Sequence, residues 1–313
     1  MEPILVTCAV AADTEQVAGL LAALEASLYG GSTFSQADLV DEWSDVDLEQ
    51  NTRVVRVGDR IVGYGAVRER GERWAAEGYV HPSAIGRGIG KVIATELEQH
   101  AAKRGARTIQ SSVWEADTAG RRLLESLGYC AVRVFRELRI ELDAPPPAPE
   151  WPDGLRVVAF DPQRDARDFH AAQEEAFADN WEYTPHTFEW WSKVFLGSER
   201  FDPTLWCVVR AADEIAAGTI CTGDTYGGGW VQELFTRRRW RRKGVATGLL
   251  RDSFSRFWER GEHNIGLSVD TADPGALRLY ERAGMAPALG FITYEKRLAT
   301  SPTQGGDGFS TTS

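Results

Sequence analysis

Two glycine-rich turns carry residue types and spacing that favour the binding of a pyrophosphate group. They read Gly86-Arg-Gly-Ile-Gly90 and Arg241-Arg-Lys-Gly-Val-Ala246, and each stands between a predicted strand and a predicted helix. Small residues let the backbone approach a ligand. The first N–H groups of a helix have no acceptor within it, so they and the helix dipole attract an anion. By itself such a turn is equally compatible with a purely structural role.

A glutamate precedes each turn, on the predicted strand that leads into it. Glu233 lies three residues before Thr236, and Glu77 holds the same place before the other turn. A partly buried carboxylate beside a ligand site can take a proton from a bound group, directly or through one water. We therefore expect Glu233 to act as a general base. The alternative is an edge-strand glutamate that faces solvent.

Both sites belong to a long internal repeat. Residues 74–128 reappear without a gap as residues 230–284, so that Glu77 aligns with Glu233. Solenoid units repeat every ~20–50 residues, so a repeat of this extent indicates a duplicated domain. The copies differ where chemistry would occur, because Tyr280 in the second stands where the first has Leu124. We expect the second copy to be catalytic and the first to be degenerate.

Hydrophobic periodicity predicts the same series of elements in each half. A strand and an amphipathic helix come first, and two short strands joined by a hairpin turn follow. Next come the strand, the turn and the long helix of the candidate site, then a strand, a short helix and a last strand that completes each copy. The predicted segments are residues 4–9, 14–29, 52–57, 60–68, 74–80, 91–104, 108–113 and 132–142, and then 155–159, 166–177, 205–211, 214–221, 230–236, 247–260, 265–269 and 291–298.

A proline-rich segment separates the copies. Clustered prolines favour an extended backbone and continue neither a helix nor a sheet, so residues 144–154 are a predicted linker. We therefore predict an N-terminal domain over residues 1–143 and a C-terminal domain over residues 155–298. The Ser/Thr/Gly-rich residues 299–313 lack apolar periodicity and are a predicted disordered tail.

Composition excludes several classes of protein. The chain has 313 residues, 43% hydrophobic and 26% charged, which suits about two folded domains. Its formal net charge of −11 disfavours a nucleic-acid binder, despite the basic run at 237–243. No apolar run approaches the ~18–20 residues that cross a bilayer, and the first residues are not a basic leader. Four scattered cysteines and the absence of metal-ligand spacing predict a cytoplasmic protein without a metal.

Beyond these turns, an acidic run precedes the first hairpin. Its members are Asp41, Glu42, Asp45, Asp47 and Glu49. We expect them to form a solvated acidic face, and the alternative is a channel for a cationic substrate.

The two motifs resemble those of the GNAT superfamily of acyl-CoA-dependent N-acyltransferases. Its first signature, Arg/Gln-x-x-Gly-x-Gly/Ala, is matched by Arg241, Gly244 and Ala246, whereas Ile85 replaces the basic residue in the first copy. Its later motif, Asn-x-x-Ala-x-x-Leu-Tyr-Glu-x-x-Gly-Phe, is matched with Asp for Asn and Met for Phe. The matching residues are Asp273, Ala276, Leu279, Tyr280, Glu281, Gly284 and Met285.

This resemblance implies an α/β (α+β) fold with two tandem domains, each a mixed, mostly antiparallel twisted sheet flanked by helices. It implies acetyl-CoA as co-substrate, bound where the fourth and fifth strands splay apart. Tyr280 would protonate the departing thiolate, with Tyr294 as the second candidate. The residues expected at the coenzyme are Leu234, Phe235, Thr236, Arg241, Arg242, Lys243, Gly244, Val245, Ala246, Thr247 and Asp273, with Gly78, Tyr79, Val80, Gly86, Arg87, Gly88, Ile89, Gly90 and Lys91 in the first copy.

The tandem arrangement is most similar to that of the mycothiol synthase family. Residues 176–182 are similar to that family's Ala-Phe-x-x-His-Pro-Glu segment, which implies that Glu182 contacts the amine, although Asn180-Trp181 replaces His-Pro. The resemblance implies acetyl transfer to a primary amine of a small molecule, of the mycothiol-precursor, aminosugar or antibiotic type. Attack would be direct, in a monomer whose domains pack as a pseudo-dimer. The alternatives are a protein or peptide N-acetyltransferase and a coenzyme A-binding sensor or scaffold without catalysis.

Overall fold

The computed structural model describes residues 3–298, so the predicted disordered tail lies outside the described residues. The N-terminal half contains β1 (Ile4–Thr7), α1 (Thr14–Tyr29), α2 (Gln36–Trp43), α3 (Leu48–Asn51), β2 (Thr52–Val57), β3 (Arg60–Arg70), β4 (Arg73–Val80), α4 (Ile89–Lys103), β5 (Thr108–Trp114), α5 (Thr118–Ser126) and β6 (Cys130–Glu141). The C-terminal half contains β7 (Leu155–Ala159), α6 (Pro162–Phe177), α7 (Phe188–Trp191), β8 (Cys207–Ala211), β9 (Glu214–Thr225), β10 (Gly228–Thr236), α8 (Val245–Glu259), β11 (Asn264–Asp270), α9 (Pro274–Arg282) and β12 (Ala286–Arg297).

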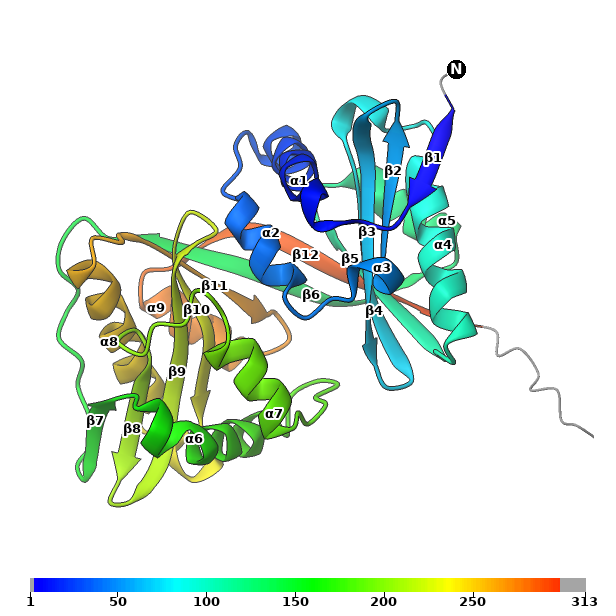
Figure 1. Ribbon diagram of the computed structural model, residues 1–313. Helices are drawn as coiled ribbons and strands as arrows, with labels where there is room; N and C mark the ends of the chain where they lie inside the picture. Colours follow the sequence, from blue (N-terminus) through cyan, green and yellow to red (C-terminus); the bar gives the residue numbers. More distant parts are fainter. Residues whose placement is uncertain (1–2, 299–313) are drawn as a thin grey trace, which may run out of the picture.

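All of these strands form one sheet with helices against both halves of it (Figure 1). The order is β1-β2-β3-β4-β5-β12-β6-β11-β10-β9-β8-β7. Among the described strands, only the pairs β4–β5 and β10–β11 are parallel, and the other neighbours are antiparallel. The predicted fold class, a mixed and mostly antiparallel sheet flanked by helices, is therefore confirmed.

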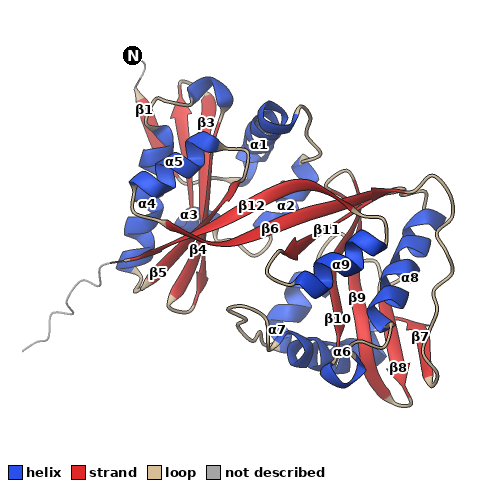
Figure 2. Cartoon of the chain, turned by 180° about the vertical axis from the view of Figure 1, so that it is seen from behind, coloured by secondary structure: helices blue, strands red, loops and turns tan. Residues whose placement is uncertain are grey.

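The last strand of each half is exchanged. Residues 291–297 of β12 pair with β5 of the N-terminal half, and β6 pairs with β11 of the C-terminal half, while β6 and β12 also pair with each other (Figure 2). The expectation that a last strand completes its own copy is thus wrong. Both copies have similar strand patterns, so the sequence does not distinguish pairing within a copy from pairing across the two.

The hydrophobic cores follow this exchange. Ile292 and Tyr294 of β12 are buried in the core of the N-terminal half, against Trp74 and Leu97. Leu138 of β6 is fully buried in the core of the C-terminal half. Each core therefore depends on a strand that the other half supplies. The 144–154 segment contains neither helix nor strand.

Helix α2 was not predicted, and it joins the two halves. Ser35 caps its first turn and accepts a hydrogen bond from the Asp38 N–H, in a reciprocal capping box. The buried Asp38 carboxylate pairs with Arg200 of the C-terminal half at 2.7 Å, and Glu42 accepts a 2.9 Å hydrogen bond from the Tyr226 hydroxyl. The expectation of a solvated acidic face is wrong for Glu42, because it faces the other half instead of solvent.

Two further observations concern the described part of the chain. No helix within residues 3–298 is long and apolar enough to cross a membrane. Over the same residues, no group of three or more histidine, cysteine, aspartate and glutamate side chains is arranged to hold a metal ion.

Candidate functional site

The sheet opens at the same place in both halves. β4 pairs with β5 only from Arg73 to Ala76, so the stretch that follows has no partner on this side. β10 pairs with β11 only at Gly229 and Trp230. Such an opening exposes main-chain N–H and C=O groups that an extended ligand can pair with. The stretches predicted to bind the pantetheine arm, 78–80 and 234–236, both lie along these openings.

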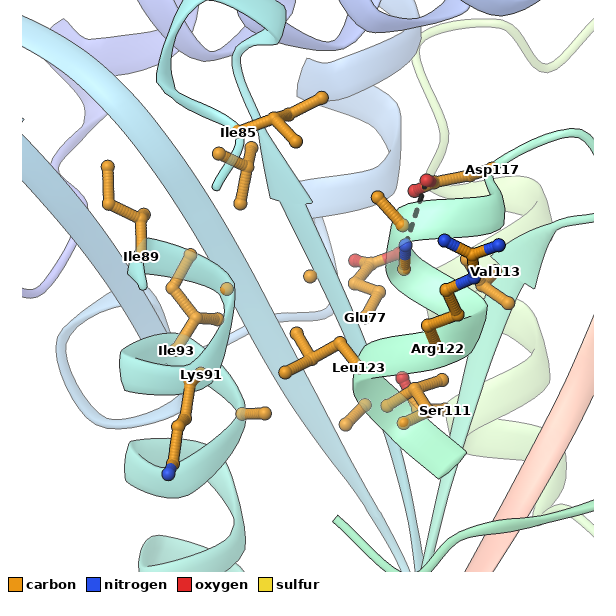
Figure 3. Close-up of a pocket in the computed structure, with 18 of the residues that line it drawn as sticks. Glu77, Ile85, Ile89, Lys91, Ile93, Ser111, Val113, Asp117, Arg122 and Leu123 are labelled. Atoms are coloured by element: carbon orange, nitrogen blue, oxygen red, sulfur yellow. Dashed lines mark hydrogen bonds between the residues drawn. The ribbon is translucent and has the colours of Figure 1, made fainter. Parts of the chain in front are cut away.

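A cavity of about 420 Å³ fills the opening of the N-terminal half. Figure 3 shows its walls: Ile89 and Ile93 project from α4, Leu123 projects from α5, and Glu77 and Ser111 lie between them. Seven of the residues predicted at the coenzyme line this cavity, namely Gly78, Val80, Gly86, Gly88, Ile89, Gly90 and Lys91. The lining residues that the sequence did not indicate include Leu24, Ser111, Leu123 and Tyr129. Its walls suit the apolar arm of a thioester cofactor.

The long helices α4 and α8 present uncapped N-termini at these openings. Gly88 and Gly244 stand at the two N-cap positions with φ of 80° and 86°, and neither offers a side-chain cap. The first intrahelical bonds there are Val92 N–H to Gly88 C=O and Gly248 N–H to Gly244 C=O. The N–H groups that come before these bonds have no acceptor within the helix. They can therefore bind an anion, which the helix dipole also attracts. Both turns thus fit a coenzyme pyrophosphate.

Glu233 lies on the part of β10 that has no β11 partner. A bulge at Gln232 shifts the register against β9, so that Glu233 pairs with Ile220. Burial raises the pKa of Glu233 to about 7. A carboxylate with a pKa near neutrality accepts a proton readily and releases it again, which is the property a general base needs.

Two tyrosines accompany Glu233. Burial raises the pKa of Tyr280 to about 12, and the charges of Asp273 and Glu233 add to this effect. The Tyr280 ring also packs against the core of the C-terminal half. The buried hydroxyl of Tyr183 makes no hydrogen bond within the described residues, and burial, Glu174 and Glu233 raise its pKa. Tyr183 was not among the site residues predicted from the sequence, because it lies in a segment without periodicity.

Most residues of the basic run 237–243, which precedes α8, make contacts with neighbouring residues. Arg241 donates to the Ala176 and Thr236 carbonyls at 2.6 and 3.1 Å, so it anchors the turn to α6 and β10. Arg242 and Lys243 are exposed, and Lys243 lies 4.9 Å from the centre of the Trp240 ring. The exposed pair therefore remains available for coenzyme phosphates. Of the other predicted residues here, Val245 is buried and Leu234, Phe235, Ala246 and Thr247 are buried or half-buried.

Three predicted residues have other contacts. Asp273 caps α9 by accepting the Gly275 and Ala276 N–H groups at 2.9 and 3.0 Å, and both Asp and Asn serve as such caps. Glu182 pairs with Arg73 at 3.1 Å and accepts from Gln110 at 2.7 Å. Tyr294 donates to Glu125 at 3.0 Å within the N-terminal half, so its interpretation as a second acid for the C-terminal site is wrong.

Glu77 differs from Glu233 in its partners. One Glu77 oxygen pairs with Arg68 at 3.0 Å, and the other accepts a 3.3 Å hydrogen bond from the Tyr79 hydroxyl. The Tyr79 ring stacks on Tyr64 and lies outside the coenzyme-side cavity, whereas it was predicted to be at the coenzyme. The Arg87 side chain is likewise not part of that cavity.

Comparison with known proteins agrees with this geometry. The model of the acetyltransferase (GNAT) family matches residues 17–129 and 164–285, one match in each half. Mycothiol acetyltransferase of Thermobispora bispora is 30% identical, with 72% of this chain and 77% of the relative covered. Mycothiol acetyltransferase of Streptomyces scabiei is 29% identical, with 78% and 77% covered.

Solved structures share the tandem architecture. A GCN5-related N-acetyltransferase from Sphaerobacter thermophilus is 33% identical, with a TM-score of 0.82 over 95% of this chain and 97% of that one. A tandem GNAT protein from the clavulanic acid biosynthesis pathway has a TM-score of 0.74 over 96% and 100% at 15% identity, which shows the fold alone. With a family match over most of its length, a splayed sheet and open helix N-termini in both halves, the chain belongs to the acetyltransferase (GNAT) family as a tandem member.

Proposed function

We propose that the C-terminal half transfers an acetyl group from acetyl-CoA to the primary amine of a small molecule. The observation that carries this proposal is Glu233, a carboxylate at the strand opening whose pKa is raised to about 7 by burial. Its counterpart Glu77 is instead held in an ion pair with Arg68. The named activity of the curated relatives supports the same reaction type.

The reaction is a direct displacement. Glu233 takes a proton from the ammonium group, the amine nitrogen attacks the thioester carbonyl carbon, and the C–S bond then breaks. Main-chain N–H groups of 234–236 receive the carbonyl oxygen, a contribution of ~2.7–4 kcal/mol per donor in other enzymes. Tyr280 gives its proton to the departing thiolate, the second proton of the attacking nitrogen restores Tyr280, and Glu233 releases its proton to solvent.

The cysteines support direct attack over a covalent acyl-enzyme. Burial raises the pKa of Cys207 well above its usual range and that of Cys221 to about 11. Both thiols are therefore protonated at neutral pH, and a thiol attacks far more slowly than a thiolate.

We place the acceptor beside Tyr183, whose buried hydroxyl needs a partner and lies close to Glu174 and Glu233. Glu182 has a supporting part in this arrangement. Its bonds to Arg73 and Gln110 hold the segment that carries Tyr183 against the N-terminal half.

Release of free thiol from acetyl-CoA, measured over a panel of amines, tests the proposal. We expect turnover with small primary amines that falls in Glu233→Gln and persists in Glu259→Gln, the same change at an exposed site of the same half. Turnover only with peptide N-termini would favour the protein-acetyltransferase alternative. Tight coenzyme binding without turnover of any amine would favour the sensor alternative.

A further inference from the structure

A second cavity, of about 140 Å³, lies in the N-terminal half. Ala76, Glu77 and Ser112 line both this cavity and the larger one between α4 and α5. Side chains alternate along a strand, so Glu77 and Tyr79 project to the opposite face from Val80, which packs toward α4 and α5. The two cavities thus meet from opposite faces at the opening between β4 and β5.

The strand exchange helps to build the second cavity. Phe291 of β12 lines it beside Trp114 of β5, and the two rings lie 6.4 Å apart. Tyr226 of the C-terminal half holds Glu42 of α2 in place next to Glu77. Both halves of the chain therefore contribute to its walls and surroundings.

Charges of both signs face this space. Arg68 and Arg70 line it from β3, and Arg68 is paired with Glu77 and, at 3.6 Å, with Asp45. Arg70 is exposed and makes no ion pair within the described residues. Burial and the neighbouring Glu77 raise the pKa of Glu42 to about 8.

We propose that this cavity binds a small zwitterionic amine, an α-amino acid in chemical class, and that the N-terminal half acetylates it. The ammonium group faces Glu77 at the strand opening, and the carboxylate pairs with Arg70. A cavity of about 140 Å³ has room for a small amino acid. The inference rests on the acetyl transfer proposed above, because the larger cavity has to hold the thioester.

The chemistry balances with the groups present. Glu77 accepts a proton from the ammonium group, and the nitrogen attacks the carbonyl carbon of the acetyl thioester. The C–S bond breaks, the nitrogen loses its second proton to solvent, and coenzyme A leaves as the thiolate, which takes up the proton held by Glu77. The N-terminal half has no counterpart of Tyr280 for this departure, since Leu124 stands at the equivalent position. A thiolate leaves without help, so the second reaction is slower but complete.

The test compares glycine and alanine with their carboxamides as acceptors in the full-length protein, with acetylated product measured by mass spectrometry. We expect the wild type to acetylate the amino acids, with kcat lowered at least tenfold in Glu77→Gln. Arg70→Ala should raise KM for the amino acids about tenfold or more and leave the carboxamides unaffected. Arg60→Ala, an exposed arginine at the other end of β3, serves as the matched control.

Three outcomes would overturn the proposal. The first is a wild type that leaves amino acids unreacted, and the second is an equal shift in KM for Arg70→Ala and Arg60→Ala. The third is amino acid turnover that is lost in Glu233→Gln and kept in Glu77→Gln. Failure of the function proposed for the C-terminal half would give a different result. In that case Glu233→Gln would leave the turnover of primary amines without a carboxylate unchanged. The ratio of amino acid to carboxamide turnover in Arg70→Ala does not depend on that result.

Discussion

Phe291 and Trp114 are register partners on neighbouring strands, with ring centroids 6.4 Å apart, although they belong to different halves of the repeat. Their contact is possible only because β12 enters the sheet of the N-terminal half. The two halves are therefore joined by continuous main-chain pairing and not by side-chain contacts alone.

The first prediction is that neither half folds alone. Without β12 the N-terminal core lacks the buried Ile292 and Tyr294, and without β6 the C-terminal core lacks Leu138. We expect residues 1–150 and 151–313, expressed separately, to aggregate or remain unfolded. Co-expression should give a 1:1 complex by analytical ultracentrifugation. A monomeric half with a cooperative unfolding transition would contradict the exchange.

The second prediction concerns the pH dependence of turnover. Glu233 acts in its ionised form and has a pKa of about 7. For a primary amine without a carboxylate, kcat/KM should therefore rise as pH increases through 7. Glu233→Gln should lower turnover by ~10²–10⁴-fold and remove this rise. A profile that is flat between pH 6 and 8 in the wild type would argue against Glu233 as the base.

The third prediction is the effect of the same residue on stability. The folded-state pKa of Glu233, about 7, lies above its ordinary value of 4.5, so folding favours the protonated acid. The stabilisation is complete below pH 4.5 and is lost as pH rises through 7. Glu233→Gln should therefore raise the free energy of unfolding at pH 9, by up to ~3 kcal/mol, and change it little at pH 4. Denaturant unfolding at the two pH values checks this, with Glu259→Gln as control.

The fourth prediction concerns the leaving group. Tyr280→Phe should lower kcat, by a factor near ~10², with little change in KM for acetyl-CoA, because the thiolate needs its proton only as the thioester breaks. Tyr294→Phe is the matched control. It loses the bond to Glu125 in the N-terminal half and should affect stability but not the C-terminal reaction. Equal kcat in Tyr280→Phe and wild type would assign Tyr280 to packing.

The fifth prediction is that both halves bind coenzyme with unequal affinity. Gly88 and Gly244 have φ of 80° and 86°, and a Cβ at either would meet open space, so Gly88→Glu and Gly244→Glu carry similar backbone strain. Each adds a carboxylate where a pyrophosphate would lie. Isothermal titration should show two sites in the wild type and one in each variant. If the wild type has a single coenzyme site and Gly88→Glu does not remove it, the first copy does not bind coenzyme and has a structural role alone.

Much of the fold could be predicted from hydrophobic periodicity and turn residues in the sequence. The predicted segments 14–29, 52–57 and 155–159 coincide with α1, β2 and β7, because each combines an uninterrupted pattern with clear end signals. The openings at Ala76 and Trp230 were expected only through the family resemblance. Pairing partners could not be predicted, since β6 and β12 have equivalent patterns and either could complete either copy. Helix α2 escaped prediction because Asp41 and Glu42 within it were interpreted as part of a solvated acidic face, whereas Glu42 bonds to Tyr226 of the other half.

The exchange of β6 and β12 also bears on how such a duplication persists during evolution. A gene copy that loses its chemistry is ordinarily free to decay or be deleted. Here deletion of the first copy would remove β6, which pairs with β11 along its length. Selection for the second copy therefore preserves the first as a folded body, whether or not it reacts. A preserved fold with an open cavity remains available for a new substrate.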